Sequence, residues 1–149
     1  KRGKRLMRIF LAAPFSNVYR SRLGKVDSRF RKRLETIIKL IMKEGHDVIS
    51  AHLRENWGQN LMPPSEFVPL DFNLIKECDL VIAYISDQPS GVYVELGWAS
   101  ALKKKIIVLT DQPISQLSPL VQELPRITQA VIISFKDEND LLMKLAALL

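Results

Sequence analysis

The feature that most constrains how this chain can fold is the unbroken apolar run from Leu80 to Ile85. A run without alternating polar residues is typical of a parallel strand that is buried on both faces of a sheet. Shorter strand-like runs occur at 8–12, 47–50, 106–109 and 130–135. Segments with helical spacing or helix caps lie between and after them, at 29–44, 65–77, 92–102, 117–124 and 138–149. We therefore predict an α/β fold, a single doubly wound, flavodoxin-like sheet of five parallel strands with helices on both faces.

The length of 149 residues fits one domain. We expect a basic N-terminal tail at 1–7, a single domain over 8–149, and a long loop in the polar, proline-containing segment 52–65. The single cysteine, Cys78, cannot form an internal disulfide, and no apolar run approaches the about 20 residues that a membrane span needs. We therefore predict a cytoplasmic protein with no membrane partner.

Positive charge is concentrated near the start of the chain. The net charge is +6, and residues 1–33 hold 12 of the 22 Lys and Arg residues, with Asp27 as their only acid. Three interpretations remain open: a nucleic-acid partner, a phosphate-bearing small ligand, or simple solubility. Nucleic-acid binding modules usually interleave aromatic residues with the basic ones or carry a known motif, and this chain does neither. We expect a small-molecule ligand and no nucleic-acid partner.

The candidate site follows from the predicted topology. Ligands of doubly wound sheets bind at the carboxyl ends of the strands, which here are followed by the loops 13–28, 51–65, 86–92 and 110–118. In the third of these loops, Ser90 and Gly91 precede a predicted helix whose free N–H groups suit an anion such as phosphate. Glu95 lies near that helix start, where the helix dipole favours an ionised carboxylate, a suitable nucleophile for an anomeric carbon.

Cleavage of a glycosidic bond with retention needs a second carboxyl group, and either Asp71 or Asp79 could supply it. Structural interpretations of the same residues stay open. A glutamate near a helix start is common for dipole reasons alone, and an aspartate before a helix or strand is commonly a cap. The segment matches neither a Walker loop nor a dinucleotide-binding glycine motif, and no cluster has metal-ligand spacing. We predict no metal and no cofactor.

Three stretches, at 9–15, 71–83 and 89–99, resemble the nucleoside 2-deoxyribosyltransferase superfamily, most closely its hydrolase branch acting on nucleoside 5'-monophosphates. The third stretch contains Glu95-Leu-Gly-Trp-Ala, which matches the family's Glu-Leu-Gly-x-Ala motif. The resemblance implies that Glu95 attacks C1' and that Asp71 assists departure of the base. It also implies that Ser90 and Gly91 hold the 5'-phosphate together with Ser118 of a neighbouring subunit, and hence a homodimer.

Other predicted substrate contacts each have a structural interpretation as well, and for Arg20 we favour the solvated surface. Phe15 either stacks on the base or anchors the core, and Arg20 either reads a pyrimidine carbonyl or phosphate or is solvated surface. His52 either bonds the phosphate or base or is structural. The remaining predicted substrate-binding residues are Phe10, Ala12 and Asp79.

These expectations combine into one functional hypothesis with alternatives. We predict a hydrolase that cleaves the N-glycosidic bond of a (deoxy)ribonucleoside 5'-monophosphate to free base and sugar 5-phosphate. A deoxyribosyltransferase that moves the sugar between bases would use the same site. A non-catalytic nucleotide-binding module would bind without turnover, and an NAD-cleaving enzyme with a glutamate nucleophile is a further alternative.

Overall fold

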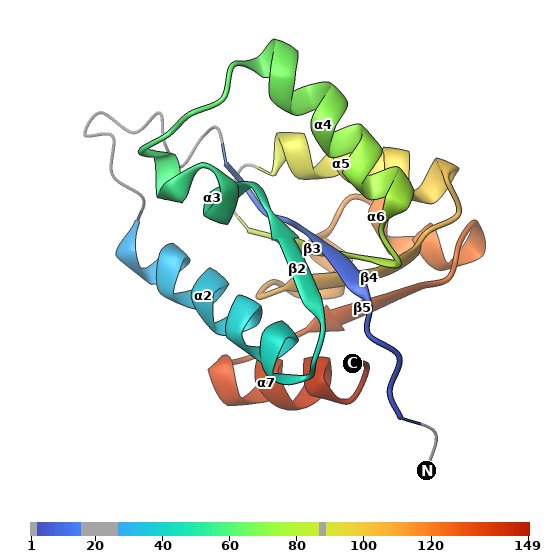
Figure 1. Cartoon of the computed structure of the whole chain (residues 1–149). Coiled ribbons are helices and arrows are strands. Elements are labelled where there is room, and N and C mark those ends of the chain that lie inside the picture. Colours follow the sequence, from blue (N-terminus) through green and yellow to red (C-terminus); the bar gives the residue numbers. More distant parts are fainter. Residues whose placement is uncertain (1–2, 16–26, 87–88) are drawn as a thin grey trace.

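Five parallel strands form one sheet in the order β2-β1-β3-β4-β5 (Figure 1). The computed structural model describes residues 3–15, 27–86 and 89–149. The strands are β1 (Arg8–Ala12), β2 (Asp47–Ser50), β3 (Leu80–Ile85), β4 (Lys105–Thr110) and β5 (Ala130–Ser134). All four pairings are parallel, and β3 lies in the centre with every residue buried. The order is that of the flavodoxin-like fold, so this prediction is confirmed.

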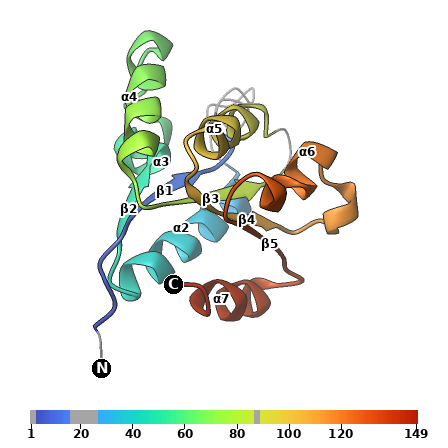
Figure 2. The same cartoon turned by 90° about the vertical axis from the view of Figure 1, so that its right-hand side faces the viewer.

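Helices cover both faces of the sheet (Figure 2). On one face lie α2 (Ser28–Lys43) and α7 (Glu138–Ala146), and on the other lie α4 (Pro64–Glu77), α5 (Ser90–Ala101) and the short α6 (Pro119–Gln122). The remaining helical elements are α3 (Ala51–Arg54) and the 3₁₀ turns η1 (Asn56–Gly58), η2 (Ile114–Gln116) and η3 (Leu124–Arg126). No helix in the described part of the chain is long and apolar enough to cross a membrane.

Two apolar layers hold the helices to the sheet. Successive side chains of a strand point to opposite faces, so β1 sends Ile9 and Leu11 into the layer under α2 and α7. It sends Phe10 and Ala12 into the layer under α4 and α5. This alternation places Phe10 and Ala12 on the face that carries the candidate site.

The segment 52–65, predicted to be a loop, instead contains α3 and η1. The Ser50 hydroxyl accepts a hydrogen bond from the backbone N–H of Leu53, which starts the helix directly after β2. Asn56 and Trp57 then adopt left-handed backbone conformations, with φ of 47° and 54°, and end it. A single helical turn is too short to show a hydrophobic period, so the sequence pattern missed it.

Two helix starts also differ from the prediction. The helix α4 begins at Pro64, not at a capping Ser65, since proline fits the first helical position well. The helix α5 begins at Ser90, two residues before the predicted start. This moves Glu95 from the first turn of the helix into the second.

Candidate active site

A pocket of about 260 Å³ opens at the carboxyl edge of the sheet. Its walls come from the end of β1 and the residues after it, from α3, from α4 and from α5 between Ser90 and Trp98. These elements meet because the strand order reverses between β1 and β3, which leaves a crevice where the connections depart in opposite directions. The pocket therefore lies where a doubly wound sheet binds its ligand.

Most of the predicted site residues meet in this pocket. Those that line it are Phe10, Ala12, Phe15, His52, Asp71, Ser90, Gly91 and Glu95. They come from four separate parts of the chain, and the two predicted catalytic carboxyl groups lie on adjacent helices, α4 and α5. The pocket is mainly apolar, with a few polar groups converging in it, as is typical of a small-molecule site.

Among the predicted residues that the structure describes, two do not line it. Asp79 precedes β3 and so lies at the amino edge of the sheet, where its carboxylate accepts a hydrogen bond from the backbone N–H of Arg8 at 2.9 Å. The prediction that Asp79 binds substrate or acts as the second carboxyl group is therefore wrong. Ser118 is partly exposed at the start of α6, outside the pocket of its own chain. Arg20 lies outside the described residues.

Glu95 is partly exposed at the pocket, and its pKa is raised to about 8. Burial among apolar walls is the main cause, the nearby Asp71 carboxylate adds to it, and Arg54 opposes it. This contradicts the expectation that the helix dipole keeps Glu95 ionised. The dipole contributes about 0.3–1 kcal/mol and fades beyond the first turn, and Glu95 stands in the second turn. Desolvation therefore prevails, and the protein by itself holds a proton on Glu95 at neutral pH.

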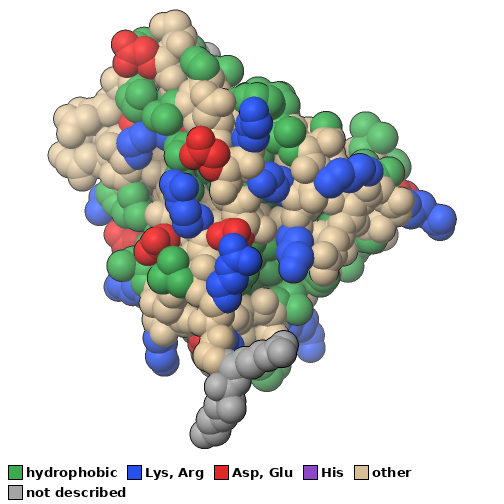
Figure 3. Space-filling model, turned by 45° about the vertical axis from the view of Figure 1, so that its right-hand side comes forward, with side chains coloured by type: hydrophobic (Ala, Val, Ile, Leu, Met, Phe, Trp, Pro, Cys, Tyr) green, Lys and Arg blue, Asp and Glu red, His purple; other side chains and the backbone are tan. Residues whose placement is uncertain are grey.

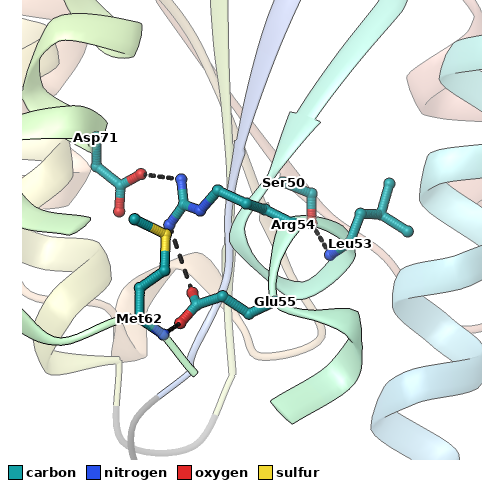
Figure 4. A network of polar contacts seen from close by, with 6 residues as sticks. All are labelled: Ser50, Leu53, Arg54, Glu55, Met62 and Asp71. Carbon is teal, nitrogen blue, oxygen red and sulfur yellow. Dashed lines mark hydrogen bonds and ion pairs between the residues drawn. The ribbon is translucent and has the colours of Figure 1, made fainter. Parts of the chain in front are cut away.

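Asp71 is buried and belongs to a network of polar contacts (Figure 4). The Nη1 atom of Arg54 donates a hydrogen bond to Asp71 Oδ1 at 2.7 Å, and Nη2 lies 3.4 Å from Glu55 Oε2. The other oxygen of Glu55 accepts a hydrogen bond from the backbone N–H of Met62 at 2.7 Å. One guanidinium thus joins two buried carboxylates, one of which is the predicted helper of base departure.

Arg54 and Glu55 are functional candidates that the sequence analysis missed. Their segment was interpreted as a loop, and the partner of Arg54 lies 17 residues away on another helix. One signal was available: both residues lie within five positions of the end of β2, on the ligand-binding edge of the sheet.

His52 is almost fully buried, and its Nε2 lies 3.1 Å from the carbonyl oxygen of Pro14. Burial lowers the pKa of the imidazole to about 4, so the ring is neutral and Nε2 donates this bond. The Phe15 ring packs edge-on against it, with centroids 4.8 Å apart. His52 therefore both lines the pocket and holds the segment after β1, so its structural and binding interpretations are compatible.

The start of α5 offers polar groups at the pocket mouth. Ser90 and Gly91 are exposed there, and a side chain at Gly91 would meet no atom within 4 Å. The first N–H groups of a helix lack intrahelical acceptors and attract anions. The described lining residues include no lysine or arginine, and the groups that they offer a phosphate here are the N–H groups at the start of α5 and the Ser90 hydroxyl.

On the one face that Figure 3 shows, the charged side chains of the described residues do not form a continuous basic path. On the face in Figure 3, Lys and Arg side chains are spread over the surface with Asp and Glu side chains between them. A binding surface for a nucleic-acid backbone would need the positive charges gathered along one path.

In the described part of the chain, no group of His, Cys, Asp and Glu side chains is arranged to hold a metal ion.

The solved structures that resemble this chain include relatives of similar length. A CMP N-glycosidase from Clostridium botulinum, BcmB, is 30% identical with a TM-score of 0.72, covering 94% of this chain and 98% of its own. BlsM is 31% identical with a TM-score of 0.80, covering 99% of this chain and 90% of its own. A 2-deoxyribosyltransferase from Bacillus psychrosaccharolyticus shares the fold at 23% identity and a TM-score of 0.61, over 90% of this chain and 89% of its own.

No curated protein sequence matches the chain significantly. The family model of the nucleoside 2-deoxyribosyltransferases does match, over residues 9–137, which include every element that forms the pocket. With the fold, the strand order and the paired carboxyl groups at its carboxyl edge, this match shows that the chain belongs to the nucleoside 2-deoxyribosyltransferase family.

Proposed function

We propose that this protein hydrolyses the N-glycosidic bond of a (deoxy)ribonucleoside 5'-monophosphate, releasing the base and a sugar 5-phosphate. The observation that carries the proposal is the placement of Glu95 and Asp71 in one pocket with unlike surroundings. Retaining cleavage of a glycosidic bond needs two such carboxyl groups, one that attacks the sugar and one that handles the proton of the leaving group.

In the proposed first step, Glu95 passes its proton to Asp71, and the Glu95 carboxylate attacks C1'. The C1'–N bond breaks, its electron pair goes to the base, and Asp71 delivers the proton to the leaving nitrogen. In the second step, Asp71 accepts a proton from water, whose oxygen attacks C1' and releases Glu95. The proton then returns to Glu95, so the carboxyl pair ends the cycle as it began and no proton is lost to solvent.

The proton held by Glu95 fits this scheme. A pair of nearby acids that retains one proton at neutral pH provides both an acid and a base from the same two side chains. The raised pKa of Glu95 therefore supports a cycle in which the pair is active while it shares a single proton.

The 5'-phosphate is assigned to the start of α5, with Ser90 and Gly91 as its ligands. Ser118 of a second subunit is assigned as an additional ligand, since it is partly exposed and does not reach the pocket of its own chain. The proposal therefore includes a homodimer in which each active site is completed by the other subunit.

The similarity to a CMP N-glycosidase at 30% identity favours hydrolysis and makes CMP the first substrate to test. Transfer of the sugar to a second base would use the same glycosyl-enzyme and is the alternative consistent with the family. A non-catalytic module would bind the nucleotide without turnover.

A single assay separates these activities. The protein is incubated with a panel of nucleosides and nucleoside 5'-monophosphates, each with and without a second free base, and the products are resolved by chromatography. Free base with sugar 5-phosphate supports hydrolysis, and a new nucleoside or nucleotide indicates transfer. Binding of CMP without either product would overturn the enzymatic proposal.

A further inference from the structure

Arg54 stands behind the wall of the candidate active site. It does not line the pocket, whereas Asp71 and Glu55, the two carboxylates that it binds, both do. Its side chain retains only 22% of its accessible surface. Arg54 therefore acts on the pocket through other side chains, and a bound substrate would contact those side chains first.

The guanidinium of Arg54 contacts one carboxylate that is fixed by the backbone, Glu55, and one that is proposed to act in catalysis, Asp71. Glu55 is 2% exposed and is fixed independently by the backbone N–H of Met62. The guanidinium spans from this fixed carboxylate to Asp71 (Figure 4). Because the guanidinium is planar and rigid, holding one of its nitrogens in place also fixes the direction of the others. The Asp71 carboxylate is thereby tied to α3 as well as to its own helix.

The guanidinium is not arranged to satisfy all of its own donors. Its Nε is buried and makes no hydrogen bond to any described residue. A buried donor without a partner is costly, and such costs are concentrated at functional sites. The arrangement favours the two contacts to carboxylates at the expense of this third donor.

Charge balance gives the arrangement a chemical role. Three acids face this part of the pocket, from α4 (Asp71), from α5 (Glu95) and from the end of α3 (Glu55), and Arg54 is the cation that contacts two of them. The neighbouring His52 is neutral. Fully ionised, the three acids and one guanidinium would carry two net negative charges, in a mainly apolar pocket that is proposed to receive a phosphate as well.

We propose that Arg54 is a positioning residue of this active site, which orients the Asp71 carboxylate from behind the pocket wall and supplies the positive charge beside the acids of the pocket. This inference rests on the proposed function for its catalytic consequence. The effect of Arg54 on the pKa of Glu95 does not depend on which substrate the protein binds.

The test uses Arg54→Met, which removes the positive charge, and Arg54→Lys, which keeps the charge but removes the planar guanidinium that can bind two carboxylates at once. Arg126→Met is the matched control, because Arg126 lies on the exposed turn η3 and pairs only with Glu123 among the described residues. The titration of the Glu95 carboxyl carbon is followed by NMR, with the signal assigned by its loss in Glu95→Gln. Steady-state kcat, KM and the pH profile are then measured with CMP.

We expect Arg54→Met to move the Glu95 titration to higher pH, because a cation that favours the carboxylate has been removed. The alkaline limb of the pH–rate profile should move in the same direction, and kcat should fall on the order of 10- to 100-fold with little change in KM. Arg54→Lys should titrate close to the wild type and still lose kcat, because an ammonium cannot hold two carboxylates as a planar fork. Arg126→Met should match the wild type throughout.

An unchanged Glu95 titration and unchanged kcat in Arg54→Met would overturn the inference. If Arg54→Met does not fold, the decision passes to Arg54→Lys, and wild-type kcat in that variant would overturn the positioning role. Inactivity of the wild type towards all nucleotides would instead overturn the proposed function. The NMR titration would still decide whether Arg54 governs the proton of Glu95.

Discussion

The guanidinium of Arg54 lies 2.7 Å from the carboxylate of Asp71, and this contact joins the first turn after β2 to the middle of α4. It gives Asp71 a charged hydrogen-bond partner, whereas Glu95 in the same pocket faces apolar walls and a like charge. The two acids therefore have unlike surroundings, and such a difference is how acid and base roles become separated in active sites.

Replacement of Glu95 by glutamine should abolish turnover with the fold retained. The amide is nearly isosteric but cannot attack C1', so kcat for CMP should fall by at least about 1000-fold. Base release measured by chromatography checks this, with circular dichroism as the measure of folding. The exposed Glu123→Gln serves as the control. Near-normal rates in Glu95→Gln would rule out the covalent mechanism.

The same substitution should remove a loss of stability that the wild type suffers at alkaline pH. The pKa of Glu95 is about 8 in the folded protein against an ordinary value of 4.5, so the folded state binds more protons between these values. The stability that Glu95 contributes is thus full below pH 4.5, and it is lost as the pH rises through 8. Glu95→Gln lacks this loss.

The measurement compares melting temperatures of wild type and Glu95→Gln at pH 5 and pH 8.5. The difference should grow in favour of the variant at the higher pH. Because the side chain is partly exposed at the pocket, only the direction of the change is predicted. A difference that is constant across this range would show that Glu95 titrates normally.

The activity itself should decline above about pH 8. Under the proposed mechanism the carboxyl pair must hold one proton to deliver to the leaving base, and the raised pKa of Glu95 sets the pH at which that proton is lost. The profile of kcat/KM for CMP between pH 6 and 10 checks this. A rate that instead rises through pH 8 would mean that the ionised pair is the active form.

Replacement of Asp71 by asparagine should slow base departure more than binding. The expected loss in kcat is about 100- to 10,000-fold, as for removal of a general acid–base group. A substrate with a nitrophenolate leaving group needs little proton assistance, so the variant should recover much of its rate on a nitrophenyl riboside 5-phosphate. An equal loss on both substrates would assign Asp71 a binding role only.

Replacement of Ser118 by alanine should raise KM for CMP and leave hydrolysis of cytidine, which lacks the phosphate, unchanged. The loss of one hydrogen bond to a charged group corresponds to about a 10- to 100-fold rise in KM. Mixing Ser118→Ala with Glu95→Gln subunits tests whether the serine acts across a dimer. Hybrid dimers would contain one site with neither substitution only if Ser118 belongs to the neighbouring subunit, so tight CMP binding with turnover in the mixture checks the assignment.

Much of the architecture could be predicted from the sequence. The apolar run of β3 required a central parallel strand, and the alternation of short runs with helical segments required helices between strands. These patterns are local and periodic, so they can be recognised in the sequence without the tertiary contacts. The rule for the carboxyl edge of the sheet also located Glu95, Ser90 and Gly91 correctly in one pocket. Applied to Asp79, which precedes its strand, the same rule would have excluded it.

What the sequence by itself determined is therefore the order of the elements and the edge at which their chemistry collects, because both follow from short-range pattern and chain connectivity. Only the tertiary structure decided the charge state of Glu95 and the pairing of Arg54 with Asp71. The first depends on how deeply α5 sits against apolar neighbours, and the second joins residues on two helices that no periodicity relates. The desolvation of Glu95 and the ion pair of Arg54 with Asp71 both depend on neighbours from distant parts of the chain, which come together only when the chain folds.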